Sequence, residues 1–163
     1  SPPAGGGGEI GLVTDAARGF AVTPPKGFVP WPEGKAVTVL VAYRDPFTHS
    51  TFTLAAYPSP DTAEVVKKRT VQSYSEVFSA FTVLRNEKLK RAGAEVSPET
   101  WLVEMESRYG NFGTRQMQVF SKKGEDVFLL TYTAAEKDYL KCKASFEKSL
   151  ETFHFLEAAG PAR

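Results

Sequence analysis

The spacing of apolar residues changes abruptly between residues 133 and 136, and this change constrains the fold more than any other feature of the chain. Before it, residues 127–132 alternate as in a β-strand with apolar side chains on both faces. Thr133 and Glu136 have capping-box spacing, which predicts that a helix begins directly after this strand. On that helix the apolar residues recur every three or four positions, at Tyr139, Cys142, Phe146, Leu150 and Phe153.

Other strands are predicted wherever apolar and polar residues alternate, or where both faces are apolar between turn residues. The glycines of the GNFG and KKGED connectors permit the positive φ values of tight hairpins. Strands clustered in hairpins, with helices between and after them, favour an α+β fold with an antiparallel sheet, in the order βββαββββα. The predicted strands are residues 18–22, 36–44, 51–57, 82–91, 100–109, 115–121 and 126–134.

The first helix is predicted to begin near residue 60. Its cap is either Ser59, before Pro60, or Asp61. The basic run at residues 67–69 lies largely off the apolar stripe and is expected to face solvent. The stripe consists of Val66, Thr70, Tyr74, Val77 and Phe81.

The composition fits one compact domain and excludes some classes of partner. The chain has 163 residues, of which 42% are hydrophobic, and its formal charge is +1. This balance lacks the long-range positive field of a general nucleic-acid binder, so no nucleic-acid partner is predicted. No apolar run reaches the roughly 18 to 20 residues of a membrane span.

The first residues are rich in proline and glycine, which predicts a flexible tether over residues 1–17, a single domain over 18–156 and a disordered tail over 157–163. Such a tether is typical of the segment after the lipid-bearing cysteine of a bacterial lipoprotein. A signal peptide and that cysteine would then precede Ser1, and the protein would be periplasmic or bound to the cell envelope. The alternative is an ordinary disordered end or an expression remnant.

The sequence contains few side chains that could support catalysis or bind a metal, so the chain is predicted not to be an enzyme and to hold no cofactor or metal. His49 and His154 are distant from each other and define no nucleophile–base set. Cys142 is expected to be a small core residue rather than a redox sensor. Glu104 and Glu106 share a strand face, and a solvent-facing edge is favoured over an acid–base pair.

Two groups of side chains are candidates for binding a protein partner. Phe28 and Trp31 lie in a proline-rich loop, where a rigid indole can anchor a partner, although both rings could instead fold back over the core. The densest basic patch can be explained as a solvated strand, but it is kept as a second candidate: Arg85, Lys88, Lys90 and Arg91.

Over residues 18–156 the chain resembles the PsbP-like superfamily, which includes the photosystem II PsbP subunit, the Mog-type Ran-binding protein and DcrB-type bacterial lipoproteins. The resemblance consists of element order and three short signatures: Phe-x-x-x-x-Pro-x-Gly-Phe at residues 20–28, Tyr-Thr-Ala at 132–134 and Ser-Phe at 145–146. It implies a twisted antiparallel sheet of six or seven strands sandwiched by helices. Neither metal-binding histidines nor a Ran-binding surface carries over residue by residue.

The resemblance and the tether together lead us to expect a non-enzymatic accessory or scaffold lipoprotein of the cell envelope that binds a protein partner. The membrane contact would be only through the N-terminal lipid. The alternative is a carrier or chaperone for a small ligand or a hydrophobic segment.

Overall fold

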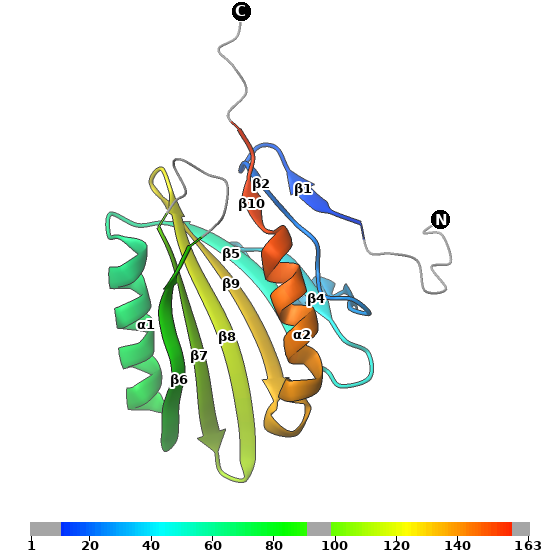
Figure 1. Ribbon diagram of the computed structural model, residues 1–163, viewed down its shortest axis with the longest axis vertical. Coiled ribbons are helices and arrows are strands. Elements are labelled where there is room, and N and C mark those ends of the chain that lie inside the picture. Colours follow the sequence, from blue (N-terminus) through cyan, green and yellow to red (C-terminus); the bar gives the residue numbers. More distant parts are fainter. Residues whose placement is uncertain (1–10, 91–98, 158–163) are drawn as a thin grey trace, which may run out of the picture.

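The computed structural model describes residues 11–90 and 99–157. A seven-stranded antiparallel sheet, ordered β3-β4-β5-β9-β8-β7-β6, has α1 on one face and α2 on the other, and a small sheet, β1-β2-β10, lies at one end of α2 (Figure 1). The elements are β1 (Val13–Asp15), β2 (Phe20–Val22), β3 (Val29–Pro30), η1 (Pro32–Gly34), β4 (Val39–Arg44), β5 (Thr51–Pro58), α1 (Ala63–Val77), β6 (Ala80–Leu89), β7 (Thr100–Tyr109), β8 (Phe112–Lys123), β9 (Asp126–Ala135), α2 (Glu136–Thr152) and β10 (His154–Phe155). The predicted α+β class is confirmed.

Strand β9 shows why the central strands are apolar on both faces. Leu130 and Tyr132 belong to the cluster that α2 covers, whereas Val127 and Leu129 belong to the cluster that α1 covers. Since successive side chains of a strand point to opposite faces, each face needs its own apolar set. Cys142 is buried in the α2 cluster, as predicted.

The predicted meander is confirmed, because two-residue turns join β7 to β8 and β8 to β9. Tyr109 pairs with Phe112 and Lys123 pairs with Asp126 across these turns. The first residue of each turn is a glycine with a φ of 61°. Only glycine adopts this left-handed backbone without a steric cost from a Cβ atom.

The small sheet was not predicted, and part of it falls in the predicted tether. β1 pairs with β2, which pairs with β10, and the Leu156 N–H donates to the Gly19 carbonyl over 2.9 Å. Strand β2 falls in the predicted strand 18–22, but β1 and β10 have only three and two residues, which are too few to show a period of two. The rest of the predicted tether and tail, residues 1–10 and 158–163, lies outside the described residues.

Both predicted helix caps are wrong. Helix α1 is capped by Thr62, whose Oγ1 accepts the Val65 N–H over 3.2 Å, and not by Ser59 or Asp61. Helix α2 has Ala135 at its N-cap and no side-chain cap. Thr133 cannot cap it, because β9 continues through this residue and pairs it with Thr51.

The predicted apolar stripe of α1 is also only partly right. Val66 is buried and Tyr74 packs against the α1-face cluster, but Val77 is 71% exposed. The helix meets the sheet mainly through β7 and β8. Its last turn therefore leaves Val77 in solvent.

Candidate functional site

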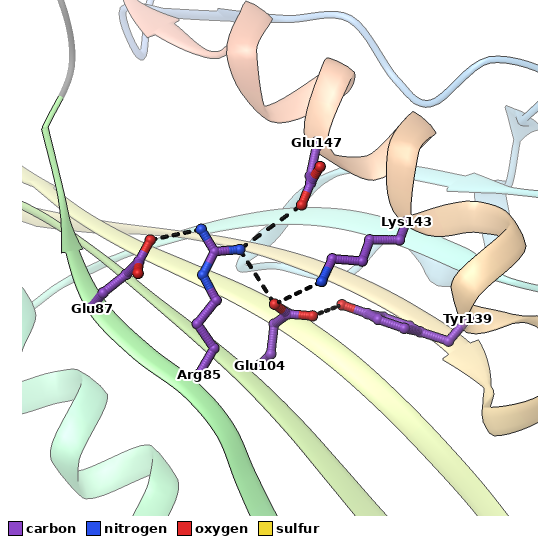
Figure 2. A network of polar contacts seen from close by, with 6 residues as sticks. All are labelled: Arg85, Glu87, Glu104, Tyr139, Lys143 and Glu147. Atoms are coloured by element: carbon purple, nitrogen blue, oxygen red, sulfur yellow. Dashed lines mark hydrogen bonds and ion pairs between the residues drawn. The ribbon is translucent and has the colours of Figure 1, made fainter.

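A connected group of ionisable side chains with a buried centre lies between α2 and strands β6 and β7 (Figure 2). Its centre is Glu104 of β7, which is only 4% exposed. Glu104 points to the α2 face because it alternates with Val103 and Met105, which belong to the cluster under α1. The prediction that Glu104 faces solvent is therefore wrong, since α2 covers it.

Three side chains from two other elements satisfy the Glu104 carboxylate. The Tyr139 hydroxyl donates to Oε2 over 2.6 Å, while Arg85 Nη1 and Lys143 Nζ lie 3.3 and 3.4 Å from Oε1. Arg85 comes from β6, and the other two come from successive turns of α2. The carboxylate thus ties α2 to the pair of consecutive strands β6 and β7.

The network continues outward through Arg85. Its Nη2 lies 2.6 Å from Glu87 Oε1, and its Nη1 lies 3.9 Å from Glu147 Oε1 (Figure 2). The hydrogen bond with Glu87 is the main reason that the pKa of Arg85 is raised. Two cations and three carboxylates therefore form one connected group that becomes more exposed toward the edge of the sheet.

The electrostatics of the network favour a structural role over acid–base chemistry. Burial alone would raise the pKa of Glu104, but the Tyr139 hydrogen bond and the Lys143 and Arg85 cations outweigh it, so the pKa is lowered. Burial, together with the hydrogen bond to Glu104, raises the pKa of the Tyr139 phenol. Near neutral pH the carboxylate is thus ionised and the phenol protonated, and neither group exchanges a proton readily.

Glu106 does not join Glu104 in a carboxylate pair. Its Oε2 lies 3.3 Å from Arg115 Nη2, and the Arg115 guanidinium lies over the Tyr139 ring, 6.0 Å from its centroid. The two carboxylates share a face of β7, as predicted, but each has its own cations.

The predicted binding residues of the proline-rich loop lie at the β3 edge of the sheet. Phe28 is 3% exposed and packs edge-on against Phe146, with 6.0 Å between ring centroids. It is therefore a core residue and presents no surface to a partner. Trp31 is half-buried and folds against Gly34, where an added Cβ would lie 2.3 Å from its ring. Its role in binding stays a prediction.

The predicted basic patch lies at the opposite edge, on β6. Arg85 is held in the Glu104 network, whereas Lys88 and Lys90 are exposed. Arg91 lies outside the described residues. The two groups of candidates thus occupy opposite edges of one sheet and do not form one surface.

A second buried cation, under α1, was missed. Lys67 is 2% exposed, although the basic run was predicted to face solvent. Its Nζ lies 3.9 Å from the centroid of the Trp101 ring and donates to Asn86 Oδ1 over 2.8 Å. Because Lys67 lies one turn after Ala63, which faces the sheet, the helical spacing could have placed it on the buried side.

An open groove of about 510 Å³ lies where the chain passes from β5 into α1. An ion pair of 2.7 Å between Arg69 and Asp61 lies at its wall, and Lys122 Nζ donates to the Ser59 and Asp61 carbonyls. The Asp61 and Arg69 side chains and the Ser59 and Asp61 carbonyls are thus already held by contacts within the protein. The groove is lined by Tyr57, Pro58, Ser59, Pro60, Asp61, Val66, Arg69, Thr70 and Ser73.

Residues 11–90 and 99–157 contain no group of three or more histidine, cysteine, aspartate or glutamate side chains placed to hold a metal ion. Within the same residues, neither helix is long and apolar enough to cross a membrane.

Similarity to known proteins is found at the level of structure. No family model matches the chain, and no curated protein matches it. Among solved structures, the cyanobacterial PsbP protein CyanoP from Synechocystis superposes with a TM-score of 0.66 over 93% of this chain and 96% of CyanoP, at 18% identity. The chain has a PsbP-like fold.

Two further solved structures share the PsbP-like fold. LpqN of Mycobacterium tuberculosis, which is involved in cell envelope biogenesis, has a TM-score of 0.60 at 12% identity, and the match covers 90% of each chain. PA94 of Pseudomonas aeruginosa, a protein of unknown function, also has a TM-score of 0.60, at 11% identity over 89% of this chain and 96% of PA94. At these identities the likeness concerns the fold, and the function has to be inferred from the surface.

Proposed function

We propose that this protein is a non-enzymatic accessory or scaffold lipoprotein of a bacterial cell envelope, and that it binds a protein partner. The observation that carries the proposal is the fold shared over nearly the whole chain with CyanoP and with LpqN, a protein of cell envelope biogenesis. The proline- and glycine-rich N-terminal sequence is the second support, because it suits a tether between a lipidated cysteine and a folded domain.

The interior of the domain also favours a binding role over catalysis. The ionisable side chains around Glu104 are closed by their own hydrogen bonds and ion pairs. The apolar faces of the sheet are filled by side chains of α1 and α2. A partner would therefore meet the edges of the sheet and the ends of its strands, where backbone and side chains are accessible.

Affinity capture from the native host tests this function. The full-length tagged protein is extracted in detergent, captured and analysed by mass spectrometry against an untagged strain. We expect one near-stoichiometric partner and recovery of the protein in the membrane fraction. Capture of the bait alone would contradict a stable accessory role.

A metabolic label tests the proposed anchor in the same cells. An alkyne-bearing fatty acid is supplied to the host, and incorporation into the captured protein is read after coupling to a dye. We expect labelling. An unlabelled protein in the membrane-free fraction would contradict the lipoprotein part of the proposal but leave partner capture to be judged independently.

A further inference from the structure

Three segments meet at one end of the molecule: the last turn of α1, the start of β6, and the turn between β7 and β8 (Figure 1). The Ser79 hydroxyl donates to the Arg108 carbonyl over 3.3 Å, and Ala80 pairs with Arg108. Tyr109 follows Arg108 as the last residue of β7, so its backbone lies next to the α1–β6 connection.

Aromatic side chains gather on the α1 face at this end. Tyr74 stacks on Phe78 and on Phe81, with centroid separations of 5.5 and 6.3 Å. Tyr109 points to the same face, since it alternates with Met105, which packs under α1, and it pairs with Phe112 across the turn. With Val77 they form a surface that we call the aromatic patch: Tyr74, Val77, Phe78, Phe81, Tyr109 and Phe112.

The aromatic patch is accessible. Tyr109 is 77% exposed and Phe112 is 62% exposed, and Val77, at the end of α1, is 71% exposed. Apolar side chains with this exposure cost little when they are scattered singly over a surface. Grouped on adjacent elements, they are typical of a site that another molecule covers.

The patch is also nearly free of charge. Glu76 is the only charged residue in residues 70–84, and residues 109–114 contain none, although 24% of the chain is charged. Enrichment in aromatic residues with depletion of charge is the composition of a protein–protein interface core. An anionic membrane surface would instead favour lysine and arginine around the apolar side chains.

The first half of β6 borders the patch and lies at the edge of the sheet. No described strand pairs with the outer side of β6. Phe81 and Val83 face the α1 side, because they pair with Ser107 and Met105. Beyond Val83 the register shifts at a bulge, and the charged side chains of the second half follow. Bulges and charges discourage strand pairing, so residues 80–83 are the part open to a new strand.

From these observations we propose that residues 80–83 and the aromatic patch bind an extended, uncharged, apolar-rich segment of a partner protein. The segment adds a strand beside β6 and places alternate side chains against Phe81, Val83 and the aromatic rings. Backbone hydrogen bonds supply affinity that is independent of sequence, and the rings supply the preference for apolar side chains. This inference rests on the proposed function, since it names the surface and the chemistry of the partner.

A peptide selection tests the surface without knowledge of the partner. A library of displayed ten-residue peptides is selected on the full-length protein, and the binding of the enriched peptides is then measured by fluorescence polarisation. We expect uncharged sequences with alternating apolar residues. Tyr109→Lys should weaken their binding at least tenfold, and Val83→Lys should do the same from the strand side.

The matched control is Phe47→Lys, in the turn between β4 and β5. Phe47 is 89% exposed and lies outside the aromatic patch, so this variant introduces the same charge and should bind the peptides like the wild type. Circular dichroism melts must agree among the four proteins, which separates lost binding from lost folding. Selection of charged peptides, or equal binding to Tyr109→Lys, overturns the proposal.

Two further measurements identify other occupants. A wild-type dimer that Tyr109→Lys converts to a monomer in sedimentation would assign the patch to a second copy and overturn the proposal. So would binding to phosphatidylcholine vesicles that the same variant abolishes. A captured partner that still binds Tyr109→Lys would leave the proposed function intact and refute this surface. If peptides bind the patch but no partner is captured, the proposed surface is supported and the proposed function is refuted.

Discussion

The two faces of the sheet bury charge in different ways. Under α2, the Glu104 carboxylate meets two cations and a phenol. Under α1, the Lys67 ammonium meets an indole and an amide, and the Oε1 atom of Gln118 is buried with no hydrogen-bond partner in the described residues. An unsatisfied buried acceptor costs about 1–3 kcal/mol. The α2 face has one such atom as well, the Nε atom of Arg115, so the two faces differ in how they hold a buried charge and not in how completely their polar atoms are satisfied.

The two faces also differ in how far their helices cover them. α2 follows β9 without a connecting loop and places aromatic rings over the middle of its face. α1 ends with Val77 exposed and with the aromatic patch at its last turn. We therefore expect the more completely covered face to contribute more to stability, and on our proposal the less completely covered face provides the surface for binding.

The largest change in the free energy of unfolding is expected from the two methionines, and they test this difference because one lies on each face. Met117 is fully buried in the α2 cluster, and Met105 lies in the α1 cluster. Replacing a buried methionine with alanine costs about 2–5 kcal/mol. We expect Met117→Ala to lower the free energy of unfolding toward the upper end of this range and Met105→Ala toward the lower end. Urea unfolding measures both, and the opposite order would contradict the comparison.

Removing the Glu104 charge should give the next largest effect. Glu104→Gln keeps the shape but leaves Arg85 and Lys143 without their shared carboxylate, so we expect a loss of about 2 kcal/mol at pH 7. Glu106→Gln is the control, since its partly exposed pair with Arg115 should contribute less than about 1 kcal/mol. Equal losses in urea unfolding would contradict the assigned role of Glu104.

The loss in Glu104→Gln should also depend on pH. The pKa of Glu104 is lowered in the folded protein, so its stabilisation is complete above the unfolded pKa of about 4.3. It is lost as the pH falls through the lower, folded pKa. The difference between wild type and variant should therefore shrink in unfolding measurements at pH 3. A constant difference would show that the charge of Glu104 is not its cause.

Replacing Lys67 should have the smallest effect. Lys67→Met removes a cation–π contact but also removes the cost of burying an ammonium, and we expect a net change below about 1 kcal/mol at pH 7. Burial lowers the pKa of Lys67, so the unfolded chain binds the proton more tightly. Wild type should thus gain stability relative to the variant as the pH rises toward about 10.4. Unfolding at pH 7 and pH 10 tests the sign, and a gain for the variant would contradict it.

The sequence was sufficient to predict the longer strands and both helices, because those segments repeat a period over enough residues. It missed β1, β3 and β10, which have only two or three residues each. It also chose the wrong cap residue for both helices; at α2, Thr133 has the side chain of a cap but belongs to β9. A local sequence pattern cannot show that a residue pairs with a strand distant in the sequence, as Thr133 pairs with Thr51.

The candidate site was less predictable, since its members come together only through tertiary structure. Glu104 meets Tyr139 and Lys143, 35 and 39 residues later, and Arg85 reaches it across the β6–β7 pair. Trp31 and Lys88 were both predicted as binding residues, in two separate groups, and they lie at opposite edges of the sheet. The two residues are far apart because the order of the strands in the sheet differs from their order along the sequence.

This strand order also determines the order in which the domain can assemble. β6 to β9 follow one another along the chain and pair with their neighbours, so each pairing closes a short loop. Thr51 of β5, in contrast, pairs with Thr133 of β9, 82 residues later. The entropy of closing a loop grows with its length, and non-local contacts slow folding. We therefore expect the meander to fold first and to serve as the template onto which the β4–β5 hairpin docks.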